Sequence, residues 1–403
     1  MARAKRTDNK GRVLKVGESQ NKDGRYCFKW TDCTGRRNTV YALDLAELRA
    51  KEKQIQRDME DGIDSQSANM TLNQLFEMYL ESKSNIRKST RCCYLKQWNN
   101  NVKSSVIGEM KISQIKQIHI KRLYADLNRR GLEGSSIQVF HVLLSAVFQL
   151  AADSDMIRKN PCKNCRKDIK TNSCHRKALT VNEQKILLDF AKDSSIYNTY
   201  YPILMFALST GLRVGELSGL TWDDVDLKNG VLHVRKQLVY LDYGEGYKLH
   251  VEPPKSKSGE RDIPLTANAR KSLIQQKEID LSSGRRAKEK AVDGVKGFVF
   301  INSNGRAMLP INFNNMLKNI TNAYNKKETV QAKEERRESV LLPHISAHIL
   351  RHTFCTRMAE AGIDAKVLQR LMGHSNIAVT MDVYNHCDLE RIQNEVKKAE
   401  NIM

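Results

Sequence analysis

Four separated stretches of the sequence carry side chains that are suited to chemistry on a phosphate group. They are Thr210–Leu217 (TGLRVGEL), Pro253–Leu265 (PPKSKSGERDIPL), His344–Thr353 (HISAHILRHT) and Gly373–His386 (GHSNIAVTMDVYNH). Taken alone, each has an ordinary structural explanation. Arg213 could pair with Glu216 one helical turn on, and Tyr384 could belong to the apolar face of a short helix. Only as a set do the four stretches indicate a reaction.

The reaction that fits this set is cleavage of a DNA phosphodiester without a metal ion. A tyrosine oxygen can attack phosphorus and keep the energy of the broken bond as a phosphotyrosine. Arg213 and Arg351 would hold the negative oxygens of the transition state with forked, permanently charged donors. A histidine would exchange the proton of the nucleophile, and a lysine would protonate the leaving 5′ oxygen. His348 and Arg351 lie one helical turn apart and should share a face.

A metal-dependent nuclease is an alternative, because His344, His348 and His352 are spaced by four residues and would share one helix face. However, no tight cluster of Asp and Glu suggests a two-metal site. The sequence also lacks a phosphate-binding loop of the GxxxxGK[ST] type, which argues against nucleotide hydrolysis.

The four stretches fall in a region, 177–403, whose pattern is mostly helical. A capping box from Thr180 to Glu183 opens it, and a β stretch over 231–264 interrupts the helices. Within that stretch, residues 253–265 predict a β-hairpin that carries Lys257 at its tip. Lys255 is the alternative lysine.

The first 66 residues predict a small DNA-binding domain. Short strands at 12–17, 25–31 and 37–41 are separated by turn signals, and a helix should follow from Asp44 to about Asp61. Arg25 and Lys29 lie on or beside the strands. Their face of the sheet is either simply solvated or reads DNA.

Residues 70–160 predict a module of four helices, over 71 onward, 87–106, 118–130 and 135–153. The second helix carries the basic residues Arg87, Lys88, Arg91 and Lys96. A solvated helix face would explain them. Their position near a helix N-terminus, where backbone N–H groups also suit phosphate, favours contact with DNA.

Residues 161–176 predict a basic linker between the helical module and the catalytic region. Cys162, Cys165, Cys174 and His175 could form a Cys3His zinc site there. A plain linker is the favoured interpretation, because free thiols are expected in a chain without a regular cysteine framework. The overall fold class is therefore mainly α with small β elements, an α+β arrangement of three domains.

Charge and composition favour a cytoplasmic protein that binds a polyanion. The net charge is +21, and the helical region 71–175 is the most basic, with 18 Lys and Arg against 8 Asp and Glu. Nucleic acid is the commonest polyanionic partner. No run of eighteen apolar residues and no signal peptide is present, so we expect no membrane association and a location at the bacterial nucleoid.

The order R…K…HxxR…H…Y resembles the tyrosine recombinase, or phage-integrase, family. TGLRVGEL, HILRHTF and LMGHSNIAVTMDVYNH match its three main motifs in order, and the lysine segment lies between the first two. The resemblance covers about 175–403. The two upstream regions are similar to the arm-site-binding and core-binding domains of such integrases. The segment GRVLKVGESQNKDGRYCFKW is most similar to integrases of conjugative transposons.

The resemblance implies a site-specific recombinase that integrates and excises a mobile element and needs no cofactor or metal. It implies a role for each matching residue, as follows: Tyr384 as nucleophile, Arg213 and Arg351 on the phosphate, His348 as general acid/base, His374 as a phosphate contact, Lys257 as leaving-group acid and Glu216 as an orienting carboxylate. It also implies double-stranded DNA as substrate, a homotetramer, a Holliday junction and a small excisionase-type accessory protein.

Two rival interpretations share this scaffold. A type IB topoisomerase would rejoin the same strand, and a regulator would bind DNA without cutting it. Two further segments lie outside these interpretations. The charged insertion at 326–339 has no assigned role, and the tail 388–403 could pack onto its own domain or onto a neighbouring protomer.

Overall fold

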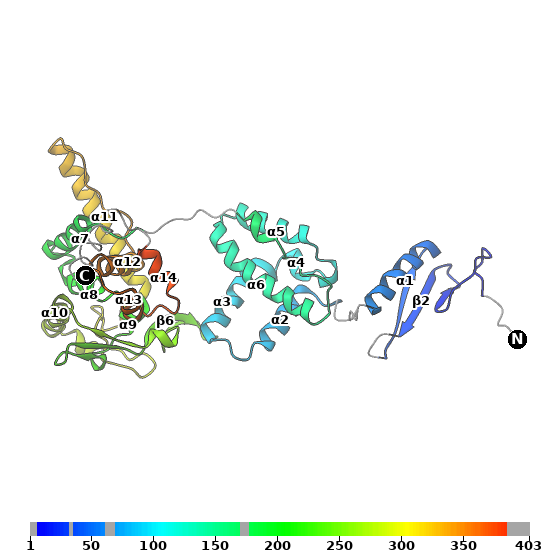
Figure 1. Cartoon of the computed structure of the whole chain (residues 1–403), viewed down its shortest axis with the longest axis horizontal. Helices are drawn as coiled ribbons and strands as arrows, with labels where there is room; N and C mark the ends of the chain where they lie inside the picture. The colour runs from blue at the N-terminus through cyan, green and yellow to red at the C-terminus, as the bar shows by residue number, and fades with distance from the viewer. Residues whose placement is uncertain (1–5, 32–34, 61–68, 170–176, 385–403) are drawn as a thin grey trace, which may run out of the picture. The chain divides into compact units, whose positions relative to one another are not determined.

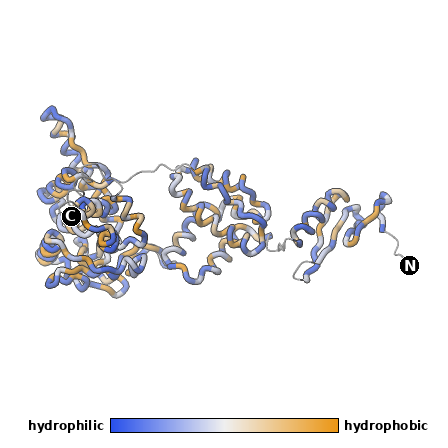
Figure 2. The backbone as a smooth tube through the Cα atoms, in the orientation of Figure 1, coloured by the Kyte–Doolittle hydropathy of each residue, from blue (hydrophilic) through white to orange (hydrophobic). Residues whose placement is uncertain are grey.

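The structure is a computed structural model that describes residues 6–31, 35–60, 69–169 and 177–384 (Figure 1). The chain divides into two compact units, Met1–Cys174 and His175–Met403. The first unit holds two separate hydrophobic cores, one in a small sheet and one in a group of helices. Along the tube in Figure 2, hydrophobic and hydrophilic segments alternate on the helices, as expected for amphipathic elements that bury one face.

The N-terminal core belongs to an antiparallel sheet covered by one helix. Its elements are β1 (Glu18–Gln20), β2 (Tyr26–Thr31), β3 (Arg37–Ala42) and α1 (Leu45–Glu60). Tyr26 and Phe28 of β2 pack against Leu48 of α1. The predicted strand at 12–17 is wrong, because the first strand is β1. Gly17 has φ +89° and lies too close to the Phe28 ring for any side chain, which breaks an extended run there.

The second core belongs to a helical group that we predicted as four helices. The structure gives α2 (Leu72–Ser82), α3 (Lys88–Trp98), α4 (Val106–Glu109), α5 (Gln117–Arg129) and α6 (Gly134–Asp153), with 3₁₀ turns at Ile112–Gln114 and Cys165–Asp168. The predicted helix 87–106 is too long. A π-helical turn, Asn99–Lys103, follows α3, because three consecutive asparagines compete for local backbone hydrogen bonds.

Among the described helices, α6 alone is long and apolar enough to cross a membrane by length and composition. Phe140, Leu144, Val147 and Phe148 of α6 are buried in the helical core. A core helix gives the same composition signal as a membrane span, and this burial accounts for it.

The predicted linker 161–176 begins too early. Cys162 and Cys165 are fully buried in the helical core, and Cys165 donates a long hydrogen bond of 3.5 Å to the Pro161 carbonyl. Burial raises the pKa of the Cys162 thiol, which opposes the thiolate that zinc requires. Cys174 and His175, the other two ligands of the possible zinc site, lie outside the described residues. Within the described ranges, no group of three or more His, Cys, Asp or Glu is placed to hold a metal ion.

The second unit is mostly helical, as predicted. Its helices within residues 177–384 are α7 (Val181–Asp193), α8 (Tyr201–Thr210), α9 (Val214–Gly219), α10 (Ala267–Ser283), α11 (Pro310–Glu334), α12 (Ala347–Glu360), α13 (Ala365–Met372) and α14 (Ala378–Tyr384), with 3₁₀ turns at Asn198–Tyr200, Trp222–Asp224, Lys257–Gly259 and Arg285–Lys288. Its strands are β4 (Val225–Asp226), β5 (Val231–Val234), β6 (Gln237–Asp242), β7 (Tyr247–Glu252) and β8 (Arg261–Pro264).

The predicted lysine hairpin is wrong in its topology. β7 pairs with β6, whereas β8 pairs with β5 in a separate sheet of order β4-β5-β8. Lys257 therefore lies in a connection between two sheets rather than at a hairpin tip. Pro253 and Pro254 explain the break, since proline lacks the N–H that would continue the β6–β7 ladder.

The charged insertion at 326–339 forms the end of α11 and the chain that returns from it. Figure 1 shows α11 extending beyond the rest of its unit. Arg337 forms an ion pair with Glu328, and the Val340 N–H donates to the same carboxylate at 2.9 Å. The side-chain hydrogen bond from Arg337 lowers the pKa of Glu328 to about 2. These charges therefore stabilise the end of this long helix.

Candidate active site

Arg213 stands between two helices that a glycine turn separates. Gly211 ends α8 with φ +60°, and a Cβ there would lie 2.3 Å from the Phe354 ring, so only glycine fits. Arg213 then caps α9. Its backbone N–H donates to Glu216 Oε2 at 3.0 Å, and its Nη1 donates to Glu216 Oε1 at 2.8 Å. Its Nη2 donates to the Gly373 carbonyl at 2.7 Å.

Arg351 comes from α12 and is buried beside Arg213. Its Nη1 donates to the Gly211 carbonyl at 2.6 Å, and its Nη2 donates to the Met372 carbonyl. Burial, and then the charge of Arg213, lower the pKa of Arg351 to about 9. A buried guanidinium that donates only to neutral carbonyls keeps its full positive charge, which is unfavourable in a site of low dielectric constant. An anion that binds there would offset this desolvation free energy.

His374 follows the residue that ends α13. Gly373 ends this helix with φ +63°, and His374 Nδ1 forms a hydrogen bond of 2.9 Å with Thr380 Oγ1 of α14. Burial lowers the pKa of His374 to about 4, and the charges of Arg351 and Arg213 add to that effect. The ring is therefore neutral at physiological pH, which suits a hydrogen-bonding role rather than proton transfer.

Arg261 of β8, for which we predicted no role, forms a cluster with Arg213 and Arg351 around Glu216. Its side chain is only 2% exposed. Its Nη1 and Nη2 donate to the two oxygens of Glu216 at 3.1 and 2.9 Å, and its Nε donates to the Leu371 carbonyl at 2.6 Å. One signal in the sequence could have identified it. In β8 the residues alternate between buried and exposed, so Arg261 shares the inward face with Ile263.

Glu216 is the buried carboxylate that joins the two arginines. Burial alone would raise its pKa, but hydrogen bonding to Arg261 and the charges of Arg261 and Arg213 hold the pKa of Glu216 below its usual value. The carboxylate is therefore ionised. With Arg351, the cluster contains three positive charges and one negative charge, so it carries a net positive charge suited to a phosphate.

The lysine segment lies against the same turn. A Cβ added to Gly373 would be 2.9 Å from the Ser258 carbonyl, so the residue next to Lys257 closely approaches the turn between α13 and α14. Lys255 and Lys257 both have exposed side chains. The structure therefore brings the segment that carries both lysines to the turn beside the arginines.

Tyr384 is the last residue of α14 and has a different environment. It packs against a small core that includes Phe354, Leu368 and Met372. Its hydroxyl donates to the backbone carbonyl of Ile363, in the turn before α13. The hydroxyl must leave this carbonyl before it can attack a phosphate.

His348 lies on α12 three residues before Arg351, as predicted, and its side chain is exposed. The predicted face that joins His344 to His348 and His352 is wrong, because α12 begins at Ala347 and leaves His344 outside the helix. The geometric basis for a three-histidine metal site is therefore lost.

Family models match all three parts of the chain. The phage integrase family model covers residues 177–391, the model of the DNA-binding domain of the Tn916 integrase covers 2–59, and a phage integrase N-terminal SAM-like domain covers 71–128. The chain is 34% identical to the transposase from transposon Tn916 of Enterococcus faecalis, over 98% of this chain and 96% of that protein. The chain belongs to the phage integrase family of tyrosine recombinases.

Solved structures agree with this membership. The chain resembles the integrase of transposon Tn1549 in complex with transposon right end DNA, with 29% identity, a TM-score of 0.70, and coverage of 82% of this chain and 99% of that chain. A complex of the same integrase with circular intermediate DNA gives 28% identity and the same TM-score, with coverage of 82% of this chain and 99% of that chain. This protein is thus a site-specific recombinase that acts on double-stranded DNA.

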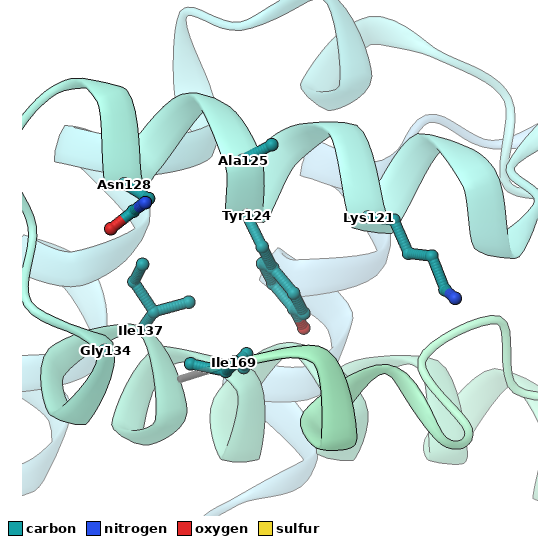
Figure 3. Close-up of a pocket in the computed structure, with 7 residues that line it drawn as sticks. All are labelled: Lys121, Tyr124, Ala125, Asn128, Gly134, Ile137 and Ile169. Carbon is teal, nitrogen blue, oxygen red and sulfur yellow. The ribbon is translucent and has the colours of Figure 1, made fainter. Parts of the chain in front are cut away.

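The basic residues predicted to contact DNA lie on exposed surfaces of this recombinase. Lys29 is exposed on β2, on the sheet face opposite α1, and Arg25 forms an ion pair with Asp23 beside the ring of Tyr41. Four basic residues at and after the start of α3 are exposed as well, namely Arg87, Lys88, Arg91 and Lys96. A cavity of about 420 Å³ between α5 and α6 is lined by Lys121, Tyr124 and Ile137 among others, and none of the predicted site residues lines it (Figure 3).

Proposed function

We propose that this recombinase integrates and excises a mobile element by forming a covalent 3′-phosphotyrosine at Tyr384. One observation carries the proposal. Arg213, which caps α9, donates to the backbone carbonyl of Gly373, and Arg351 of α12 donates to the backbone carbonyl of Met372. The same turn leads directly into α14, which carries Tyr384 at its end. A phosphate held by the two arginines would therefore lie beside the helix of the nucleophile.

The cleavage step follows from the residue types. Tyr384 Oη attacks phosphorus, the bond from phosphorus to the 5′ oxygen breaks, and Tyr384 becomes linked to the 3′ side of the strand. His348 takes the proton of the phenol, and Lys257 gives a proton to the leaving 5′ oxygen. Arg213 and Arg351 stabilise the charge that builds on the non-bridging oxygens. The 5′-OH of a partner strand reverses the step, so neither ATP nor a metal is consumed.

His374 and Glu216 have supporting roles in this proposal. Because the ring of His374 is neutral, it donates one hydrogen bond to a phosphate oxygen while Thr380 fixes its orientation. Glu216 orients Arg213 through two hydrogen bonds. Neither residue exchanges a proton with the substrate.

The other parts of the chain would recognise DNA and build the assembly. In this proposal residues 1–66 bind arm sites through Arg25 and Lys29. Residues 70–160 bind core sites through Arg87, Lys88, Arg91 and Lys96. Four protomers assemble on two sites, form a Holliday junction, and respond to a small excisionase-type protein. The tail 388–403, outside the described residues, docks onto a neighbouring protomer, and the reaction takes place in the cytoplasm.

A nicked suicide substrate tests the proposal. The nick lies next to the scissile phosphate of an element end, so that the short leaving fragment diffuses away and the covalent adduct is trapped. Wild-type protein should form a protein–DNA adduct that resists denaturant, and Tyr384→Phe should form none. Exchange of strands between two labelled duplexes should accompany the adduct. Relaxation of supercoils without exchange would instead support topoisomerase chemistry, and an adduct with Tyr384→Phe would overturn the assignment of the nucleophile.

A further inference from the structure

Arg261 holds together three segments that are far apart in the sequence. The segments are the start of α9 through Glu216, the end of α13 through the Leu371 carbonyl, and its own loop through the Gly259 carbonyl at 2.9 Å. Each described donor atom of this guanidinium is used within the protein. With its side chain 2% exposed, Arg261 has no surface with which to contact DNA directly. Its effect on a bound phosphate must therefore pass through other residues.

The residue through which it acts is Glu216. Arg213 and Arg261 share this carboxylate, and Glu216 Oε1 accepts from both of them. Without Arg261, Glu216 would be a buried carboxylate with Arg213 as its main cationic partner. In a low-dielectric site the two would attract each other more strongly, and Arg213 would have less charge to offer a phosphate.

Arg261 also contacts the turn that leads to His374. Its Nε bonds to Leu371 at the end of α13, and a Cβ on Gly373 would lie 3.0 Å from its Nη1. The side chain thus packs directly beneath the turn that leads from Gly373 to His374. Loss of the guanidinium would remove the support on which this turn rests.

We propose that Arg261 is a positioning residue for the cleavage reaction. Arg261 neutralises the charge of Glu216 and supports the 371–374 turn, and these two contacts keep Arg213 and His374 facing the scissile phosphate. This inference rests on the proposed function. It predicts that substitution of Arg261 slows cleavage more when the scissile phosphate is charged than when it is neutral, although Arg261 does not contact the phosphate. A merely structural arginine would not show that dependence.

A comparison of two substrates tests this dependence with the full-length chain. One suicide substrate carries the natural phosphodiester, and the other carries a neutral methylphosphonate at the scissile position. On the natural substrate, Arg261→Met should slow adduct formation about 100-fold, in the range seen when one transition-state donor is lost. DNA affinity should change less than about threefold, because phosphate contacts elsewhere dominate binding. On the methylphosphonate, the loss should shrink to less than about tenfold, because there is less charge for Arg213 to stabilise.

A double-mutant cycle adds a second test of the route through Arg213. On the methylphosphonate substrate, Arg261→Met should cost less than about threefold in a protein that already carries Arg213→Met, because coupled residues are not additive. Equal losses in the presence and absence of Arg213 would overturn the proposal. Equal losses on the two substrates would overturn it as well.

Arg286 provides a matched control. It also binds a buried carboxylate, Asp280, and donates to the backbone carbonyls of Phe298 and Val299. Arg286→Met should reduce thermal stability without any preference between the two substrates. If Arg261→Met does not fold, Arg261→Lys replaces it. That variant keeps the charge but loses the two-point contact, and it should show the same preference with a smaller loss.

The outcomes also separate the two proposals. If wild-type protein forms no adduct, the proposed function fails. If wild type forms the adduct and Arg261 variants react like Arg286→Met, only the positioning role fails.

Discussion

The cluster of Arg213, Arg261 and Arg351 and the helix α14, which carries Tyr384, lie in the same unit, but they are built differently. Arg351 and Arg261 are buried, and each arginine of the cluster makes several bonds to backbone or to Glu216. By contrast, α14 has seven residues, of which only Thr380 is buried, and Val379 and Met381 are exposed. The cluster is preorganised, whereas Tyr384, the proposed nucleophile, lies on a short helix with few buried residues.

This difference indicates how the binding of a phosphate and the cleavage of the DNA strand can be separate steps. Donors that are already in place bind a phosphate without a cost of reorganisation. Tyr384, with its hydroxyl on the Ile363 carbonyl, must first change its hydrogen-bond partner. A helix of seven residues gains little stability from its own backbone, so small changes in its packing shift its position. We therefore expect changes in the cluster to affect catalysis most, and changes at its junction with α14 to affect it less.

The largest effect is expected for Arg351→Met. Adduct formation should fall about 1,000-fold, because a buried guanidinium that stabilises the transition state is removed. Arg357→Met on the same helix is the control, since Arg357 pairs with Glu360 and the Leu179 carbonyl. Single-turnover assays should show a change of less than about threefold for the control. A comparable loss of adduct formation in both variants would mean that the arginine cluster has no specific role in cleavage.

Gly373→Ala should have the next largest effect, because it disturbs the junction between the two regions. A Cβ there would meet the Ser258 carbonyl at 2.9 Å in a backbone with φ +63°. We expect adduct formation to slow about 10- to 100-fold and the unfolding free energy to fall by about 3 kcal/mol.

Gly284→Ala isolates the contribution of that contact. Gly284 ends α10 with φ +61°, and nothing lies within 4 Å of its Cβ position. Only the backbone strain of about 1 kcal/mol should remain, as measured by urea unfolding. Equal rates of cleavage in both glycine variants would show that the turn does not need to approach the lysine segment.

Thr380→Val should have a smaller effect, because it loosens a single link between the cluster and α14. The change removes the hydrogen bond to His374 Nδ1 but keeps the shape of the side chain. Loss of one hydrogen bond is worth about 1 kcal/mol, so cleavage should slow about fivefold. Thr353→Val, at a buried threonine that bonds to Ile349 and Leu179, should lower stability without this loss of rate. If Thr353→Val slowed cleavage and Thr380→Val did not, the hydrogen bond from Thr380 would not be what orients His374.

The last prediction concerns the stability of the fold at low pH rather than the rate of cleavage. The pKa of His374 falls from 6.5 in the unfolded chain to about 4 in the folded one. Between these values the unfolded chain binds the extra proton, so stability falls as pH drops from 6.5 toward 4. The full difference amounts to about 3 kcal/mol. His374→Asn should flatten this part of the profile in urea titrations, and an unchanged slope would show that His374 does not titrate as described.

Much of this arrangement could be predicted from the sequence. Helical periodicity located α1, α5 and α6 to within a residue or two, and motif spacing predicted the pair Arg213 and Arg351 that meets at the 372–373 turn. Strand pairing was harder to predict. Because the residues of 253–265 are compatible with a hairpin, only the long-range pairing of β8 with β5 shows that none forms there.

Tertiary contacts also explain what else was missed. The role of Arg261 depends on partners 45 and 110 residues away, Glu216 and Leu371, which no local pattern connects. The bond from the Tyr384 hydroxyl to Ile363 is equally invisible in the sequence, since it joins a side chain to a backbone carbonyl across a turn. Motifs therefore predicted the reacting groups, whereas the structure was needed to show which contacts hold the arginines and Tyr384 in place.

The most direct test of the account is to identify the atom that links protein to DNA. Trapped adduct would be digested with protease and nuclease, and the modified peptide sequenced by mass spectrometry. We predict a nucleotide joined through its 3′ phosphate to Tyr384, with a free 5′-OH on the released strand. A nucleotide on any other residue, or a link through a 5′ phosphate, would contradict the proposed chemistry.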